Sequence, residues 1–169
     1  MDAVTETMES PLVAEAIKKA AVAWVSIDDG PAYALWCLPV EGALYVVSGP
    51  GEQSAPGLAE AQTAAVTLRG DHGGRIVTWP AAVTRVEPDG EQWQEIAHQV
   101  AAKRLNARGS ISDLAQRWAR ECVLTRLAPL GLPTAGESLP DGSLAAAPRP
   151  TPAARRTAKP FRLHRVRRR

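Results

Sequence analysis

Apolar residues gather in three consecutive runs between residues 21 and 53, and short turn sequences separate these runs. The turns are Asp29-Gly30 and Glu41-Gly42, where glycine can take the positive φ that a tight hairpin requires. The flanking residues are rich in Val, Leu, Tyr and Trp, which favour strands. The pattern predicts three antiparallel strands whose first two members are apolar on both faces. Such strands are typical of a barrel that helices or a partner chain cover.

Further elements precede and follow these three strands. Ser10-Pro11 predicts the start of a helix that reaches about Ala20, because proline is well tolerated in a first helical turn. Residues 63–69 and 75–88 predict two more strands. Pro80 lies in the second of them and cannot donate to a sheet ladder, so it requires a bulge, an unpaired edge or a change of partner strand.

Two helices and a last strand complete the predicted order. Asp89 with Gln92 resembles a capping box, and apolar residues then recur at helical spacing to about Leu105. Ser112 is the expected cap of a helix over residues 113–120, and residues 122–127 predict the final strand. The whole order predicts a mainly β fold with α-helices (α+β), namely a six-stranded barrel flanked by short helices.

Composition divides the 169 residues into three parts. We expect a flexible leader over residues 1–9, one domain over residues 10–132, and a disordered Pro/Ala/Arg-rich basic tail over residues 133–169. No apolar run is long enough for a membrane span, and the acidic N-terminus lacks a signal pattern, so we expect a cytoplasmic protein. Cys37 and Cys122 lie in separate apolar runs and read as buried hydrophobes, not as metal ligands or a disulfide.

Charge is distributed unevenly along the chain. All 18 acidic residues lie before residue 148, together with 11 basic residues, whereas nine basic residues follow it. Such a tail can attract polyanions such as nucleic acid in a salt-dependent manner. The alternative is a solvated tail that keeps an acidic body in solution.

Several motifs resemble those of the split-barrel proteins related to pyridoxamine 5′-phosphate oxidase and to the flavin or deazaflavin reductases of actinobacteria. The resemblance covers about residues 10–130. The matching residues are Trp24-Val25-Ser26, Gly42-Ala43-Leu44-Tyr45-Val46, Gly57-Leu58, Trp79 and Arg117-Trp118. It implies an FMN-binding type of split barrel and a homodimer, with an FMN or deazaflavin phosphate near the dimer interface.

In the family, the loop and short helix after the third strand hold that phosphate. Here this segment is residues 48–58, with one or two helical turns expected at residues 58–61, and a helix N-terminus suits an anion. The resemblance therefore implies a cofactor site, and its candidate residues are Trp36, Ser48, Gln53, Ser54, Arg69 and Trp79. Family members usually carry a Lys or Arg in this loop, whereas this chain has Glu52 and no cation.

Two functions follow. The first is flavin- or deazaflavin-dependent oxidation or reduction of a small molecule, for which the sequence identifies no catalytic residue and no metal site. Because the cofactor would carry the chemistry, the lack of an acid/base pair is no argument against it. The alternative is a cofactor-free binding or interaction module of the same fold, which the lost cation favours and which can contact nucleic acid through the tail.

Overall fold

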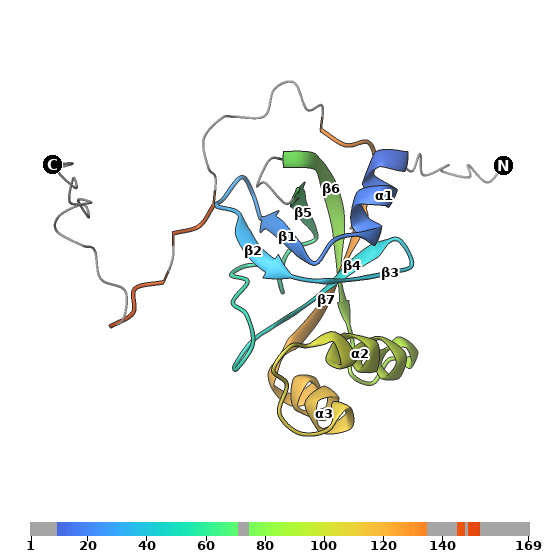
Figure 1. Cartoon of the computed structure of the whole chain (residues 1–169), viewed down its shortest axis with the longest axis vertical. Helices are drawn as coiled ribbons and strands as arrows, with labels where there is room; N and C mark the ends of the chain where they lie inside the picture. Colours follow the sequence, from blue (N-terminus) through green and yellow to red (C-terminus); the bar gives the residue numbers. More distant parts are fainter. Residues whose placement is uncertain (1–9, 71–74, 135–144, 148, 153–169) are drawn as a thin grey trace, which may run out of the picture.

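The computed structural model describes residues 10–70, 75–134, 145–147 and 149–152. The predicted leader, the turn at residues 71–74 and most of the basic tail lie outside these residues. The described part forms one seven-stranded antiparallel sheet with three helices (Figure 1). Its elements are α1 Pro11–Lys18, β1 Val22–Ser26, β2 Tyr33–Trp36, β3 Leu38–Val40, β4 Ala43–Ser48, β5 Thr63–Arg69, β6 Arg75–Val86, α2 Glu91–Lys103, α3 Ile111–Glu121 and β7 Val123–Pro129.

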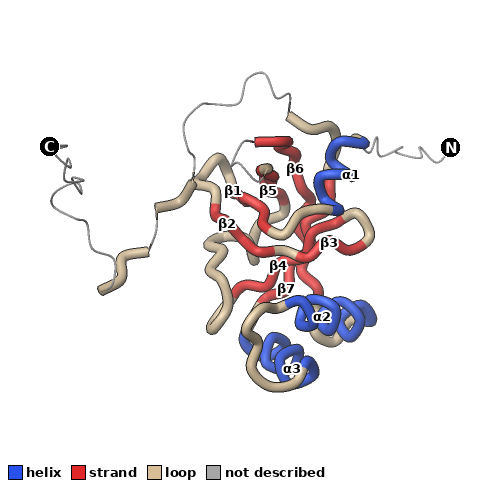
Figure 2. The backbone as a smooth tube through the Cα atoms, viewed as in Figure 1, coloured by secondary structure: helices blue, strands red, loops and turns tan. Residues whose placement is uncertain are grey.

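The sheet curls into a nearly closed split barrel, which confirms the predicted fold class. The strand order is β2-β1-β5-β6-β7-β4-β3, so β2 and β3 lie at the two ends of the sheet. These two strands come from one predicted strand that breaks at Cys37, and they pair with β1 and β4 respectively. One run of chain thereby joins both ends of the sheet (Figure 2). The predicted six runs are present, and one of them is divided.

The break in this run has its own hydrogen bonds. The amide of Cys37 donates to the carbonyl of Ala21 at 3.0 Å. The side-chain amide of Gln53 bonds both backbone groups of Trp36, with its Oε1 accepting from the Trp36 N–H and its Nε2 donating to the Trp36 carbonyl, each at 2.9 Å. Gln53 thus takes the place of a neighbouring strand where the sheet divides.

Pro80 lies where β6 changes its partner. The strand pairs with β5 as far as Ala82, and it pairs with β7 from Ala81 onward. This outcome matches one of the three arrangements expected for the proline. The register shift between β5 and β6 lies elsewhere, between Leu68 and Arg69.

The first hairpin turn differs from the prediction. Asp28 and Asp29 carry the positive φ values, 47° and 57°, and the Gly30 amide donates to the Ile27 carbonyl at 2.8 Å. Aspartate tolerates this left-handed region better than most residues, so the two acids form the turn and the glycine ends it.

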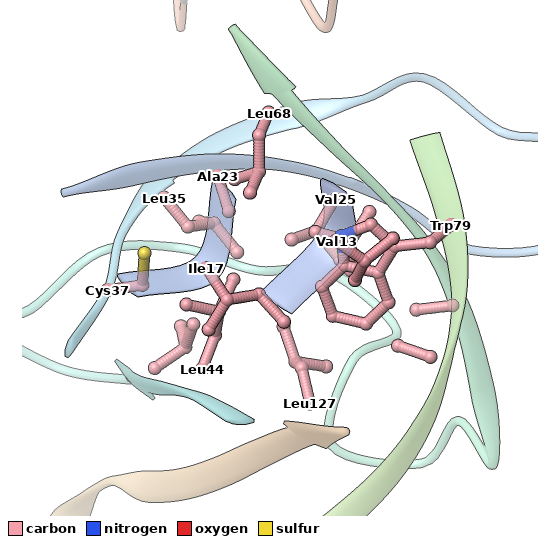
Figure 3. Packing of buried hydrophobic residues seen from close by; sticks show 14 of the residues in the cluster. Val13, Ile17, Ala23, Val25, Leu35, Cys37, Leu44, Leu68, Trp79 and Leu127 are labelled. Carbon is pink, nitrogen blue, oxygen red and sulfur yellow. The ribbon is translucent and has the colours of Figure 1, made fainter. Parts of the chain in front are cut away.

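Two apolar cores lie on opposite faces of β4, all six of whose residues are buried. Leu44 and Val46 point into the barrel, where Val13 and Ile17 of α1 close one end and Trp79 fills the interior (Figure 3). The other face of β4 packs against α2 and α3, which lie together outside the barrel (Figure 1). The strand with two buried faces is therefore β4, whereas the two-sided burial was predicted for the first two strands, and β1 buries only alternate residues.

The helix starts depart from the predicted caps. Ser10 precedes α1 but makes no side-chain capping bond, and α2 follows Gly90, so Asp89 does not cap it. Ser110, two residues before the predicted Ser112, caps α3 in a reciprocal box with Asp113. The Ser110 hydroxyl accepts from the Asp113 amide at 3.1 Å.

The chain continues along the barrel after β7. The amides of Leu130 and Thr134 donate to β6 carbonyls, and the amide of Ala146 donates to the carbonyl of Ala32, each at 2.8 Å. In the described ranges, the helices are too short and too polar to cross a bilayer.

We predict that Gln53→Ala lowers the free energy of unfolding by about 1–3 kcal/mol, because both backbone groups of half-buried Trp36 lose their partner. Urea denaturation monitored by circular dichroism measures the effect. Gln99→Ala is the control, since Gln99 bonds only an exposed Glu95 on α2. Equal stability of wild type and Gln53→Ala would show that the amide does not hold the split strand.

Candidate functional site

The predicted phosphate segment, residues 48–58, runs from the end of β4 toward β5 and contains no helix. Residues 56–60 form turns where one or two helical turns were predicted. Leu58 is buried, and its amide donates to the Ala55 carbonyl at 3.1 Å. The helix N-terminus that was expected to present amides to an anion is therefore absent at these residues, and this correction removes one argument for phosphate binding.

Glu52 points inward from this loop and is held by three donors. Arg104 Nε lies 2.8 Å from Glu52 Oε2. Arg117 Nη2 and Trp118 Nε1 both donate to Glu52 Oε1, at 2.5 Å and 3.0 Å. The Glu52 side chain is only 1% exposed, whereas those of the two arginines are 26% and 30% exposed. The carboxylate joins the loop to the C-terminal end of α2 and to α3.

The environment of Glu52 favours its charged form. Burial alone raises the pKa of this carboxyl, but the hydrogen bonds from Trp118, Arg104 and Arg117 together lower the pKa below the ordinary value for glutamate. The acid that is expected from sequence to repel a phosphate is thus neutralised inside the protein.

The loop has little freedom around Glu52. Gly51 has a φ of +75°, and a Cβ there would lie 3.1 Å from Arg117 Nη1. Arg117 Nη1 also donates to the Pro50 carbonyl at 3.0 Å, and Cys122 Sγ lies 3.7 Å from the same oxygen. Positive φ and close packing together select glycine at position 51.

Ser48 and Ser54, two predicted cofactor residues, line an open hollow of about 600 Å³ beside the loop. Among the described residues that line it, the one basic side chain is Arg149, from the segment after β7, and Glu52 and Glu60 are the acidic ones. The predicted Gln53 is engaged with Trp36, as described above. The structure brings the two serines together but directs Gln53 to the barrel.

These residues do not fit the phosphate of a flavin or deazaflavin. The loop contributes hydroxyls but no cation, and two nitrogens of each nearby arginine already bond protein oxygens, those of Glu52, Leu105 and Pro50. A phosphate dianion is held best by charge-assisted bonds, each worth about 1.5–3 kcal/mol. Binding there would require these arginines to exchange their present partners.

The two candidate tryptophans lie in different places. Trp36 is half-buried and borders an apolar hollow of about 410 Å³ with Pro39, Arg104 and Leu105. Trp79 has no exposed surface and lies in the barrel interior (Figure 3). Trp79 is therefore part of the barrel core, and we leave it out of the proposed site.

Arg69 lies on the outer face of the barrel, where its guanidinium carbon is 4.4 Å from the centroid of the Trp24 ring. Trp24 was not a predicted site residue.

The contacts of Glu52 with Arg104, Arg117 and Trp118 could not be predicted from the sequence, because these residues are 52 to 66 positions apart from it. Such pairs depend on the packing of α2 and α3 against the barrel.

The two cysteines, Cys37 and Cys122, lie in separate apolar cores. Both are buried and unbridged, as expected, and burial raises the pKa of the Cys37 thiol to about 12. Within the described ranges, no three metal-binding side chains lie together.

We predict that Glu52→Gln lowers the free energy of unfolding at pH 7 by about 2–4 kcal/mol, because two partly buried arginines lose their counter-ion. The pKa of Glu52 is lowered in the folded protein, so the stabilisation is present above the unfolded pKa, about 4.3, and is lost as the pH falls through the folded value. The difference between wild type and variant should therefore shrink below about pH 4, as measured by urea denaturation across pH.

Glu87→Gln is the matched control for this variant. Glu87 pairs with Arg85 at 3.5 Å, but both side chains are about half exposed, so we expect less than about 1 kcal/mol. A Glu52→Gln effect no larger than that of the control, or independent of pH, would contradict the assigned role of Glu52.

No model of a protein family and no curated protein matches this chain. Solved structures do match it. HutZ, a heme storage protein from Vibrio cholerae, is 16% identical with a TM-score of 0.54, and the match covers 74% of this chain and 92% of HutZ. An FAD-binding protein from Mesorhizobium loti is 18% identical with a TM-score of 0.48, covering 74% and 93% of the two chains.

A protein of Listeria innocua, provisionally named a pyridoxamine 5′-phosphate oxidase, is 16% identical with a TM-score of 0.46, covering 68% and 88%. The similarity to HutZ is one of fold. This protein therefore has a split-barrel fold, as predicted from its sequence.

Proposed function

We propose that this protein is a ligand-binding split barrel that functions without a flavin or deazaflavin coenzyme. The observation that carries the proposal is the use of Glu52 and Gln53. Glu52 neutralises the cations nearest the loop, and Gln53 completes the sheet at Trp36. Both side chains occupy the loop that the family resemblance assigns to the coenzyme phosphate, and both serve the fold.

Flavin- or deazaflavin-dependent oxidoreduction of a small molecule is the competing proposal. The position of Arg149 favours this function, because Arg149 lines the hollow at Ser48 and Ser54 and can supply one cation. The apolar hollow beside Trp36 offers a surface for a flat ring. Arg149 shares this hollow with the acidic Glu60, and Arg104 and Arg117 are already paired with Glu52. A single cation is a weak site for a phosphate dianion, so we rank this function second.

We predict that the purified full-length protein is colourless and leaves the fluorescence of added FMN and of a deazaflavin coenzyme unchanged at micromolar concentrations. Titration at two salt concentrations measures this, since attraction by the basic tail alone weakens as salt rises. Arg149→Ala tests the competing proposal. Saturable quenching in wild type that Arg149→Ala abolishes would overturn the coenzyme-free function and place the coenzyme at the loop.

We also propose that the protein is a homodimer, with a second copy covering the groove between α1 and the strands. The groove has a volume of about 550 Å³, and Leu12, Val22 and Ile76 on its walls are each about half exposed. The outer face of β1 is covered by neither α2 nor α3 (Figure 1). A second copy would remove these apolar side chains from water.

The dimer is tested by light scattering coupled to size-exclusion chromatography. We predict a dimeric mass for wild type and a monomeric mass for Val22→Glu, which buries a charge at the interface. Leu132→Glu is the control, because Leu132 is exposed but lies outside the groove. A monomeric wild type, or a dimer unaffected by Val22→Glu, would contradict this arrangement.

A further inference from the structure

The outer face of β1, β5 and β6 carries a second, polar hollow of about 250 Å³. Side chains on these strands alternate, so that apolar residues such as Val25 and Val66 enter the barrel core and their neighbours face outward. The outward positions around the hollow are polar, as is usual on the face of an antiparallel sheet that is not covered by another element. The chief polar side chains that line it are Ser26, Thr67, Arg69, Arg75 and Thr78.

Arg69 is held in place at this hollow before any ligand binds. Its guanidinium stacks on Trp24, which orients the group and shields one face of it from water. Its Nε is buried and has no hydrogen-bond partner among the described residues. A buried donor without a partner costs about 1–3 kcal/mol, so an acceptor that reached this nitrogen after a small shift of the side chain would be stabilised.

Thr67 and Thr78 add a second donor. Their hydroxyl oxygens are 2.8 Å apart across β5 and β6, so one hydroxyl donates to the other. The hydroxyl that accepts this bond keeps its own proton, and it can donate that proton to a ligand. Ser26 supplies a third hydroxyl to the lining.

Among the described residues that line the hollow, Asp29 is the acidic one, and it is exposed on the hairpin turn. Arg69 and the three hydroxyls are the donors at the hollow, whereas Arg75 already has an interaction of its own and is not counted. Carboxylate and phosphate oxygens are the acceptors that arginine and hydroxyl donors bind best. The volume suits a small molecule and is too small for an entire flavin coenzyme.

We propose that this hollow binds a small organic anion through its carboxylate or phosphate group, with Arg69 as the principal donor and the Thr67–Thr78 pair as the second. The inference rests on the proposed ligand-binding function, because it names the class of ligand. It does not depend on the loop at residues 48–57, since none of the loop residues lines the hollow.

Calorimetric titration of the full-length protein with benzoate and with inorganic phosphate tests the site. We expect saturable binding of at least one probe, weakened at least tenfold in Arg69→Gln through the loss of a charge-assisted bond. Arg85→Gln is the matched control, because it removes the same charge from β6 at an exposed position paired with Glu87. We expect this control to bind as wild type does.

A second variant, Thr78→Val, keeps both arginines and removes one hydroxyl, and we expect it to weaken binding by a smaller factor. If Arg69→Gln does not fold, the titration of Thr78→Val replaces it as the test of the site. Absence of binding for both probes, or equal weakening in Arg69→Gln and Arg85→Gln, would overturn the inference.

The outcome can be separated from that of the proposed function. Quenching of FMN or deazaflavin fluorescence that persists in Arg69→Gln would overturn the coenzyme-free function and leave the anion site standing on its own titration. Anion binding lost in Arg69→Gln, without any coenzyme binding, supports both.

Discussion

The buried carboxylate of Glu52 is the contact on which the arrangement of this protein depends. It lies between Arg104 at the end of α2 and Arg117 and Trp118 on α3, and it belongs to the loop that leaves β4. One side chain therefore connects the barrel to both outer helices. A buried carboxylate without these partners would carry a large desolvation penalty, so the loop and the helix pair are expected to order together.

The position of Glu52 also affects the point where the two ends of the sheet meet. Gln53 follows Glu52 directly, and its amide bonds the backbone of Trp36 at the break between β2 and β3. Fixing Glu52 toward the helices turns the next side chain in the opposite direction, toward the divided strand. Two adjacent residues thus hold the loop from two sides, and neither is available to a ligand in this conformation. The loop to which the family resemblance assigns a coenzyme phosphate is here part of the framework.

Local signals were enough to predict most strands. Turn residues and alternating apolar residues located β4 and β5 at their observed bounds, and the missing N–H of Pro80 correctly required a special position in β6. Contacts made through folding were not predictable in this way. The direction of Glu52 and the stacking of Arg69 on Trp24 depend on residues far apart in the sequence, and no periodicity connects them.

Errors at element ends had a different cause. Several polar residues near each helix start can act as a cap, and backbone geometry selected Ser110 over Ser112. The turn at residues 56–60 contains Pro56 and Gly57, both poor helix formers, and the glycine adopts a positive φ. The helical turns predicted over residues 58–61 follow directly after these two residues, and the chain forms turns there instead.

A crystal structure of the protein grown with millimolar FMN and phosphate tests the central claim most directly. The account predicts that the Glu52 carboxylate remains bonded to Arg104, Arg117 and Trp118, with no phosphate at the loop. A phosphate bound to these arginines, with Glu52 turned out to solvent, would contradict it.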